Sequence, residues 1–133
     1  MILVDTNVLI DVLSVDQGWK AWSAAEIERQ SLGGEVVINE IVYSELSGRY
    51  ESQRHLDAAV DGLQLAFEWL PKPALFLAGQ AFRRYRRAGG PRTSILADFF
   101  IGAHAAVARV PILTRDARRY RSYFPEVELI VPN

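Results

Sequence analysis

The sequence contains no cysteine, which excludes disulfides, a thiolate zinc site and a cysteine nucleophile. It contains only two histidines, and His55 and His104 lack the spacing of paired metal ligands, so a zinc centre is not expected. There is no basic leader segment at the start, and no apolar run approaches the roughly 20 residues that span a bilayer. We therefore expect a cytoplasmic protein without a membrane segment.

The net charge is also close to zero, at −1, but the charged residues are unevenly distributed along the chain. Residues 1–82 carry 5 Lys/Arg and 12 Asp/Glu, whereas residues 83–133 carry 10 Arg and 4 acids. A basic C-terminal third fits either a polyanionic partner or a solvated arginine-rich surface. Charge alone does not decide between the two.

The 133 residues, half of them hydrophobic, predict a single domain over 1–133. Short apolar segments predict strands, and helical periodicity predicts the segments between them. The strands are expected at 2–4, 35–38, 111–114 and 128–131, and the helices at 8–13, 18–32, 39–49, 52–68, 74–88 and 95–109. This alternation favours an α/β sandwich around a mostly parallel sheet.

Two aspartates follow predicted buried strands, Asp5 after ILV and Asp116 after ILTR. The carboxyl ends of strands in an open α/β sheet border the crevice where ligands bind. Aspartate is also a good helix cap. For either residue alone, the cap is the better explanation.

Glu45 and Asp98 are less easily explained as surface acids. Glu45 lies beside Leu46 and four residues after Ile41, so we expect it on the core-facing side of its helix. A buried carboxylate costs several kcal/mol unless it is paired or binds a metal. Pairing with Arg49, one turn later, is the structural alternative.

Asp98 is the only acid in the apolar helix predicted at 95–109. Gly102 and Ala105 follow on the same face and would let a backbone or a ligand approach. The structural alternative is an acid in the first turn, favoured by the helix dipole. His104 points elsewhere by periodicity, and we expect it in the core or an interface.

Four carboxylates without a converging histidine or cysteine suit a hard cation such as Mg²⁺ or Mn²⁺. Like charges that cluster would repel one another unless a divalent ion neutralised them. Such an arrangement is typical of phosphodiester hydrolysis, in which the metal polarises the phosphate and activates water. The sequence therefore predicts a metal-dependent hydrolase.

Four segments, MILVDTNVLID, VYSEL, ADFFIGAHA and LTRDARRY, resemble the signature segments of PIN-domain ribonucleases, specifically VapC-type toxins. The resemblance implies a three-layer α/β/α sandwich with four or five strands. It implies endonucleolytic RNA cleavage that depends on Mg²⁺ or Mn²⁺. It also implies a homodimer silenced by a VapB-like antitoxin. The implied metal-binding and catalytic residues are Asp5, Glu45, Asp98 and Asp116, supported by Thr6, Asn7 and Thr114.

The C-terminal arginines are candidates for contacts to RNA phosphates, namely Arg86, Arg87, Arg92 and Arg115. Each could instead be a surface or acid-pairing residue. A phosphatase with Asp5 as nucleophile is disfavoured, because Asn7 stands where that chemistry needs a second aspartate. A catalytically silent PIN-like module that only binds RNA or protein remains the alternative.

Overall fold

The computed structural model describes residues 1–15, 18–91 and 96–133. Its five strands form one sheet in the order β3-β2-β1-β4-β5, and every neighbouring pair is parallel. The strands are β1 (Ile2–Val4), β2 (Val36–Ile38), β3 (Ala66–Phe67), β4 (Ile112–Leu113) and β5 (Leu129–Ile130). The α/β class and the parallel sheet predicted from the sequence are confirmed.

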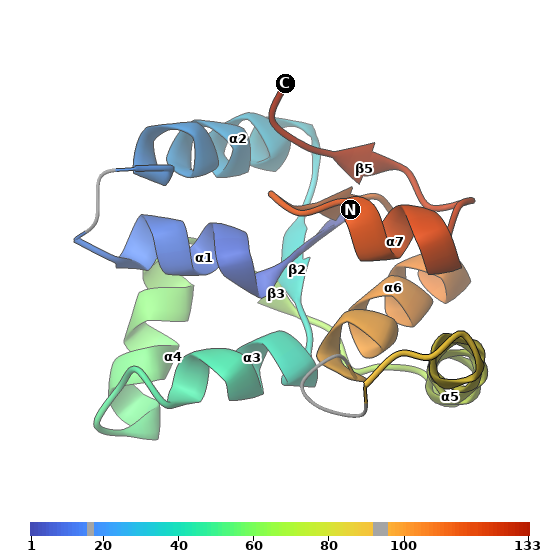
Figure 1. Ribbon diagram of the computed structural model, residues 1–133. Helices are drawn as coiled ribbons and strands as arrows, with labels where there is room; N and C mark the ends of the chain where they lie inside the picture. The colour runs from blue at the N-terminus through green and yellow to red at the C-terminus, as the bar shows by residue number, and fades with distance from the viewer. Residues whose placement is uncertain (16–17, 92–95) are drawn as a thin grey trace.

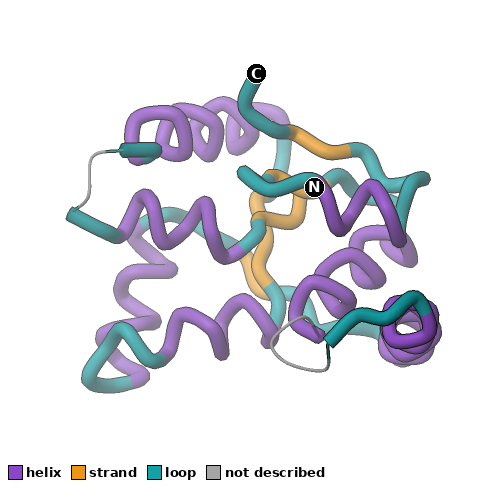
Figure 2. The backbone as a smooth tube through the Cα atoms, viewed as in Figure 1, coloured by secondary structure: helices purple, strands orange, loops and turns teal. Residues whose placement is uncertain are grey.

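Helices cover both sides of the sheet, with α1, α2 and α4 on one side and α5 and α6 on the other (Figures 1 and 2). The helices are α1 (Thr6–Leu13), α2 (Lys20–Gly33), α3 (Glu40–Ser47), α4 (Gln53–Gly62), α5 (Lys72–Arg87), α6 (Leu96–Ala108) and α7 (Arg118–Tyr123). None of the helices in the described ranges is long and apolar enough to cross a membrane.

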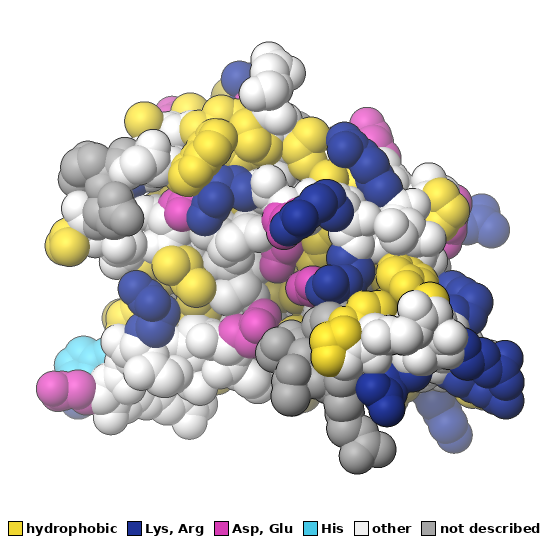
Figure 3. All heavy atoms as spheres, in the orientation of Figure 1, with side chains coloured by type: hydrophobic (Ala, Val, Ile, Leu, Met, Phe, Trp, Pro, Cys, Tyr) yellow, Lys and Arg dark blue, Asp and Glu magenta, His cyan; other side chains and the backbone are white. Residues whose placement is uncertain are grey.

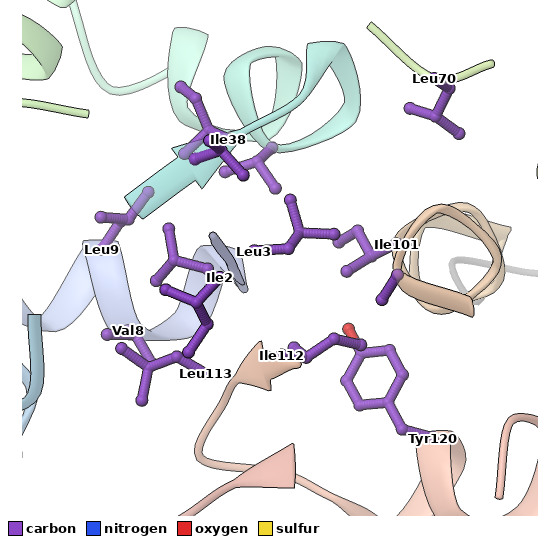
Figure 4. Close-up of a cluster of buried hydrophobic side chains, with 14 of the residues drawn as sticks. Ile2, Leu3, Val8, Leu9, Ile38, Leu70, Ile101, Ile112, Leu113 and Tyr120 are labelled. Carbon is purple, nitrogen blue, oxygen red and sulfur yellow. The ribbon is translucent and has the colours of Figure 1, made fainter. Parts of the chain in front are cut away.

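The core lies against the central strand β1, whose three residues are all buried. Strands covered on both faces are typically continuous apolar runs, and β1, β2 and β4 follow this rule. Figure 4 shows Leu3 of β1 near Ile101 of α6, with Ile112 of β4 beside Tyr120 of α7. These contacts fix α6 and α7 relative to the sheet.

Two sequence-based predictions about elements are wrong. The predicted helix 52–68 ends at Gly62, and the edge strand β3 follows it. Gln64 adopts a left-handed φ of 57°, which ends the helix, and Ala66 and Phe67 pair with β2. The prediction also omitted α7, whose arginine-rich sequence contains a single buried residue, Tyr120. Ile95, where α6 was predicted to begin, lies outside the described residues.

Candidate active site

All four acids predicted from the sequence line one cavity of about 240 Å³. The parallel register of β1 and β4 sets Val4 beside Leu113, so the segments that follow these strands leave the sheet at the same edge. The other acids come from α3 and α6. The complete lining is Asp5, Thr6, Asn7, Ile10, Glu45, Asp98 and Asp116.

Asp5 is the most buried of the four acids, at 6% exposure. Its Oδ2 accepts hydrogen bonds from the Thr114 hydroxyl at 2.8 Å and the Tyr120 hydroxyl at 2.9 Å. Burial raises the pKa of Asp5 above its usual value, and these two hydrogen bonds oppose the rise. Two hydroxyl donors on one oxygen fix the orientation of this carboxylate.

Thr114 and Asn7 join the ends of β1 and β4 by side-chain hydrogen bonds. The fully buried Thr114 Oγ1 also accepts from the Asp116 backbone N–H at 3.1 Å and from Asn7 Nδ2 at 3.3 Å. Asn7 Oδ1 in turn accepts from the Arg115 backbone N–H at 3.1 Å. Both residues hold the loop that carries Asp116 against the loop that carries Asp5.

Glu45 is an exposed residue, so the prediction that it faces the core is wrong. Val42 and Leu46 occupy the buried side of α3, and Glu45 lies beside that stripe. Its Oε1 accepts a 2.6 Å hydrogen bond from the Thr6 hydroxyl. No ion pair links it to Arg49 in the described part of the chain. The Thr6 hydrogen bond holds the Glu45 carboxylate in the cavity.

Asp98 lies in the first turn of α6, half-buried. Burial raises its pKa to about 6, the negative charge of Asp5 adds to the rise, and Arg119 opposes it. The Arg119 Nη1 lies 3.4 Å from Asp98 Oδ2. Burial, together with the neighbouring carboxylates, therefore disfavours the ionised form of Asp98.

Gly102 of α6 makes room for a ring of the chain itself. A Cβ at Gly102 would lie 2.3 Å from the Phe124 ring, so this small residue accommodates an internal aromatic side chain.

His104 on the same helix is buried, and its Nδ1 accepts from Asn39 Nδ2 at 3.1 Å. The prediction of His104 as a core or interface residue is confirmed, in the core.

Asp116 is exposed and carries a bidentate ion pair with Arg118, whose Nε and Nη2 each lie 3.2 Å from a carboxylate oxygen. These hydrogen bonds hold the pKa of Asp116 below its usual range. Asp116 and Asp98 also line a second cavity of about 350 Å³. Its remaining lining residues are Tyr85, Arg118, Arg119, Ser122 and Tyr123.

The donor set around the first cavity consists of carboxylate, hydroxyl and amide groups, which fit a hard divalent cation by their chemistry. Within the described ranges, however, no three Asp, Glu or His side chains form a ready-made metal site. Arginines of the chain contact two of the four acids instead. A divalent cation bound through Asp98 and Asp116 would therefore compete with these internal cations.

Sequence reasoning missed Tyr120 and the pairing of Arg119 with Asp98. Tyr120 lies in α7, four residues after Asp116, and is almost fully buried beside Asp5. An aromatic residue in an arginine-rich segment was the available signal. Arg119 contacts Asp98, 21 residues earlier in the chain, and no local pattern indicates such a pair.

The predicted RNA-binding arginines lie in different surroundings. Arg115 donates two hydrogen bonds to Asp11 of α1 and lies over the Trp19 ring at 5.4 Å. Arg86 donates to the Gly90 carbonyl at 2.9 Å, and Arg87 is exposed in the last turn of α5. Arg92 lies outside the described residues. Arg115 thus links the loop after β4 to Asp11 of α1 and to Trp19.

Several solved structures share this fold. One is VapBC2 from Rickettsia felis bound to a promoter DNA fragment, with a TM-score of 0.76, 16% identity and 100% of each chain covered. Another is DNA-bound VapBC from Salmonella typhimurium, with a TM-score of 0.70, 21% identity, and 98% of this chain and 96% of that chain covered. A third is VapBC-1 from nontypeable Haemophilus influenzae, with a TM-score of 0.71, 17% identity and 98% of each chain covered.

No curated protein matches the sequence. The family model described as "PIN domain" matches residues 2–125. This match includes the loops after β1 and β4 and the helices α3 and α6, and therefore every acid of the cavity. The chain belongs to the PIN domain family.

Proposed function

We propose that the protein is a metal-dependent endoribonuclease and the toxin of a VapBC-type toxin–antitoxin pair. The observation that carries the proposal is the common cavity of Asp5, Glu45, Asp98 and Asp116 in a PIN-domain chain. These acids come from four separate parts of the sequence. A helix cap or a surface ion pair explains one such acid, but neither explains why all four line one cavity.

The four carboxylates would hold Mg²⁺ or Mn²⁺. When bound, the ion would polarise the scissile phosphate and activate the attacking water. Thr114 and Tyr120 orient the Asp5 carboxylate, and Thr6 orients that of Glu45. These residues organise the negatively charged groups before a cation arrives, which limits the reorganisation that binding requires.

The toxin role is supported by the folds of the similar structures, which are described as VapBC complexes or as FitAcB from Neisseria gonorrhoeae. On this proposal the partner is a VapB-like antitoxin that covers the acidic cavity. The protein would act on RNA in the cytoplasm and form a homodimer.

Cleavage of single-stranded RNA by the purified protein tests the catalytic part of the proposal. We expect cleavage with Mn²⁺ and none with excess EDTA. Because Asp98 borders the cavity, Asp98→Asn should lower the rate by about 100-fold or more, a usual range for a lost catalytic charge. The matched control Asp61→Asn, on the exposed side of α4, should cleave at the wild-type rate.

Full activity of Asp98→Asn would contradict the assignment of that residue. Wild-type protein that binds RNA without cleaving it would favour the second candidate, a catalytically silent PIN-like module. The ion pairs of Asp98 and Asp116 are the observation that favours this second candidate, because two of the four acids already have cationic partners.

A further inference from the structure

Two consecutive arginines of α7 contact the acids that separate the two cavities. Arg119 pairs with Asp98, and Arg118 pairs with Asp116. Both guanidinium groups also line the 350 Å³ cavity, next to the cavity that all four acids line. Figure 3 shows Lys and Arg side chains directly beside acidic ones at the centre of this face.

Arg119 is held in place from its other side. Its guanidinium carbon lies 5.3 Å from the centre of the Tyr85 ring, a cation–π contact. Tyr85 itself is 8% exposed and packs against both Phe82 and Phe99. The aromatic cluster therefore positions the guanidinium at the cavity, independently of the bond to Asp98.

The bonds from the arginines to the acids are weak enough to exchange. The Arg119–Asp98 distance of 3.4 Å is long for a charged hydrogen bond, and both side chains are about one-third exposed, at 34% and 38%. Arg118 has better geometry, but its side chain is 91% exposed. Exposed pairs of this kind contribute little to stability, because water and salt screen the two charges.

We propose that Arg119, assisted by Arg118, is an internal counter-cation that a divalent metal displaces and that then binds an RNA phosphate. The inference rests on the proposed function. In the metal-free protein Arg119 neutralises Asp98. When a metal takes that carboxylate, the guanidinium stays stacked on Tyr85 and presents its donors to the 350 Å³ cavity.

The chemistry of the guanidinium fits this exchange. Its planar fork of N–H donors matches phosphate as well as carboxylate. When the Arg119 guanidinium moves from Asp98 to an RNA phosphate, metal binding strengthens RNA binding. RNA binding strengthens metal binding by the same factor, because such coupling is reciprocal. Without RNA, the same group competes with the metal and lowers its affinity.

Isothermal titration with Mn²⁺ alone tests the competition without any measurement of cleavage. Arg119→Met removes the charge and keeps an apolar stem on Tyr85, so Mn²⁺ should bind about two- to fivefold more tightly. The control Arg121→Met, exposed on α7 and in no ion pair within the described ranges, should match the wild type.

Arg119→Lys serves as a second variant, which keeps the positive charge and loses the fork. Its Mn²⁺ affinity should stay within about twofold of the wild type, since a point charge still competes. Equal tightening in Arg119→Met and Arg119→Lys would show that packing, not charge, is responsible. That result would overturn the inference.

RNA binding tests the second half of the exchange. A phosphorothioate-substituted oligouridylate should bind the wild type more tightly in Mn²⁺ than in EDTA. This ratio of affinities should be smaller in Arg119→Met and unchanged in Arg121→Met. An unchanged ratio in Arg119→Met would refute the transfer of the guanidinium to phosphate.

The outcomes separate the two proposals. Wild-type protein that binds no Mn²⁺ would overturn the proposed metal-dependent function, and the inference with it. Wild-type protein that binds and uses Mn²⁺, with no tightening in Arg119→Met, would overturn the counter-cation alone.

Discussion

Each carboxylate of the cavity has its own set of partners, and these partners set its charge. Asp5 is held by two hydroxyl donors, and Glu45 by one. Asp116 has a well-aligned guanidinium, whereas the pKa of Asp98 is raised by burial and by three acidic neighbours, and its guanidinium partner is distant. The metal-free site therefore disfavours the ionised form of Asp98.

The metal-free protein should gain stability from Asp98→Asn at neutral pH. The pKa of Asp98 is raised to about 6 in the folded state, from 3.8. Ionisation of Asp98 therefore opposes folding, and this cost grows as pH rises between these two values. The side chain is 38% exposed, so screening reduces the expected gain to about 1 kcal/mol.

Urea denaturation in EDTA measures this gain at about pH 7.5 and again near pH 4, where it should largely vanish because Asp98 is then protonated in the folded state and partly protonated in the unfolded state. A variant less stable than the wild type at pH 7.5 would mean that the Arg119 ion pair outweighs the repulsion.

Sequence reasoning singled out Asp5 and Asp116 because they follow strands, and Asp98 because it interrupts an apolar helix. It failed where the position of a residue depends on distant packing. Glu45 was placed in the core, since periodicity does not distinguish the edge of a buried stripe from its centre. The contacts of Tyr120 with Asp5 and of Arg119 with Asp98 were missed because the partners are distant in sequence.

Among the secondary-structure elements, α3 and α6 carry Glu45 and Asp98 and are joined by one buried side chain. Asn39, fully buried, caps α3 by accepting from the backbone N–H groups of Ile41 and Val42, each at 3.0 Å. Its amide also donates to His104 of α6. One residue thus fixes where α3 begins and how the two helices face each other.

Replacement of this link should cost more than the loss of a cap. Asn39→Ala removes the cap and leaves a buried imidazole nitrogen unpaired, so we expect a loss of about 2–3 kcal/mol in the free energy of unfolding. Ser52→Ala is the matched control, because Ser52 caps α4 on the surface by accepting from the His55 backbone N–H.

The control should lose about 1 kcal/mol in the same urea denaturation experiment. Equal losses in Asn39→Ala and Ser52→Ala would show that the bond between Asn39 and His104 contributes nothing to stability.

The elements themselves were predicted well where local signals and packing agree. Asn39 is both a good cap by sequence and the observed cap of α3. The edge strand β3 was missed because Ala66 and Phe67 follow α4 without a break in helical pattern. Their strand conformation comes from pairing with β2, which no local signal contains.

On the scale of the whole molecule, the charge asymmetry of the sequence becomes a surface feature. Figure 3 shows Lys and Arg side chains gathered over the α5 end of one face, next to the acidic side chains at its centre. Three arginines lie in the last turn of α5, which packs on α6. On the proposed function, this cationic surface would bind the part of an RNA strand that extends beyond the acidic cavity.

The affinity for RNA should accordingly fall as the salt concentration rises, and it should fall less steeply when these arginines are removed. For the double variant Arg86→Gln, Arg87→Gln, the slope of log affinity against log salt should become shallower by about 1.4, or about 0.7 for each phosphate that is no longer neutralised. Arg54→Gln, exposed on α4 across the sheet, is the control and should keep the wild-type slope. Fluorescence polarisation measures both, and identical slopes would place the RNA elsewhere.

The pairing of β1 with β4 has a consequence for the synthesis of the protein. Asp5 is synthesised before its neighbours Thr114 and Tyr120, which follow it by more than a hundred residues. A nascent chain lacks β4 and α7 until these segments have left the ribosome, and such long-range pairing forms late. On the proposed function, a half-made chain could not cut the RNA from which it is being translated.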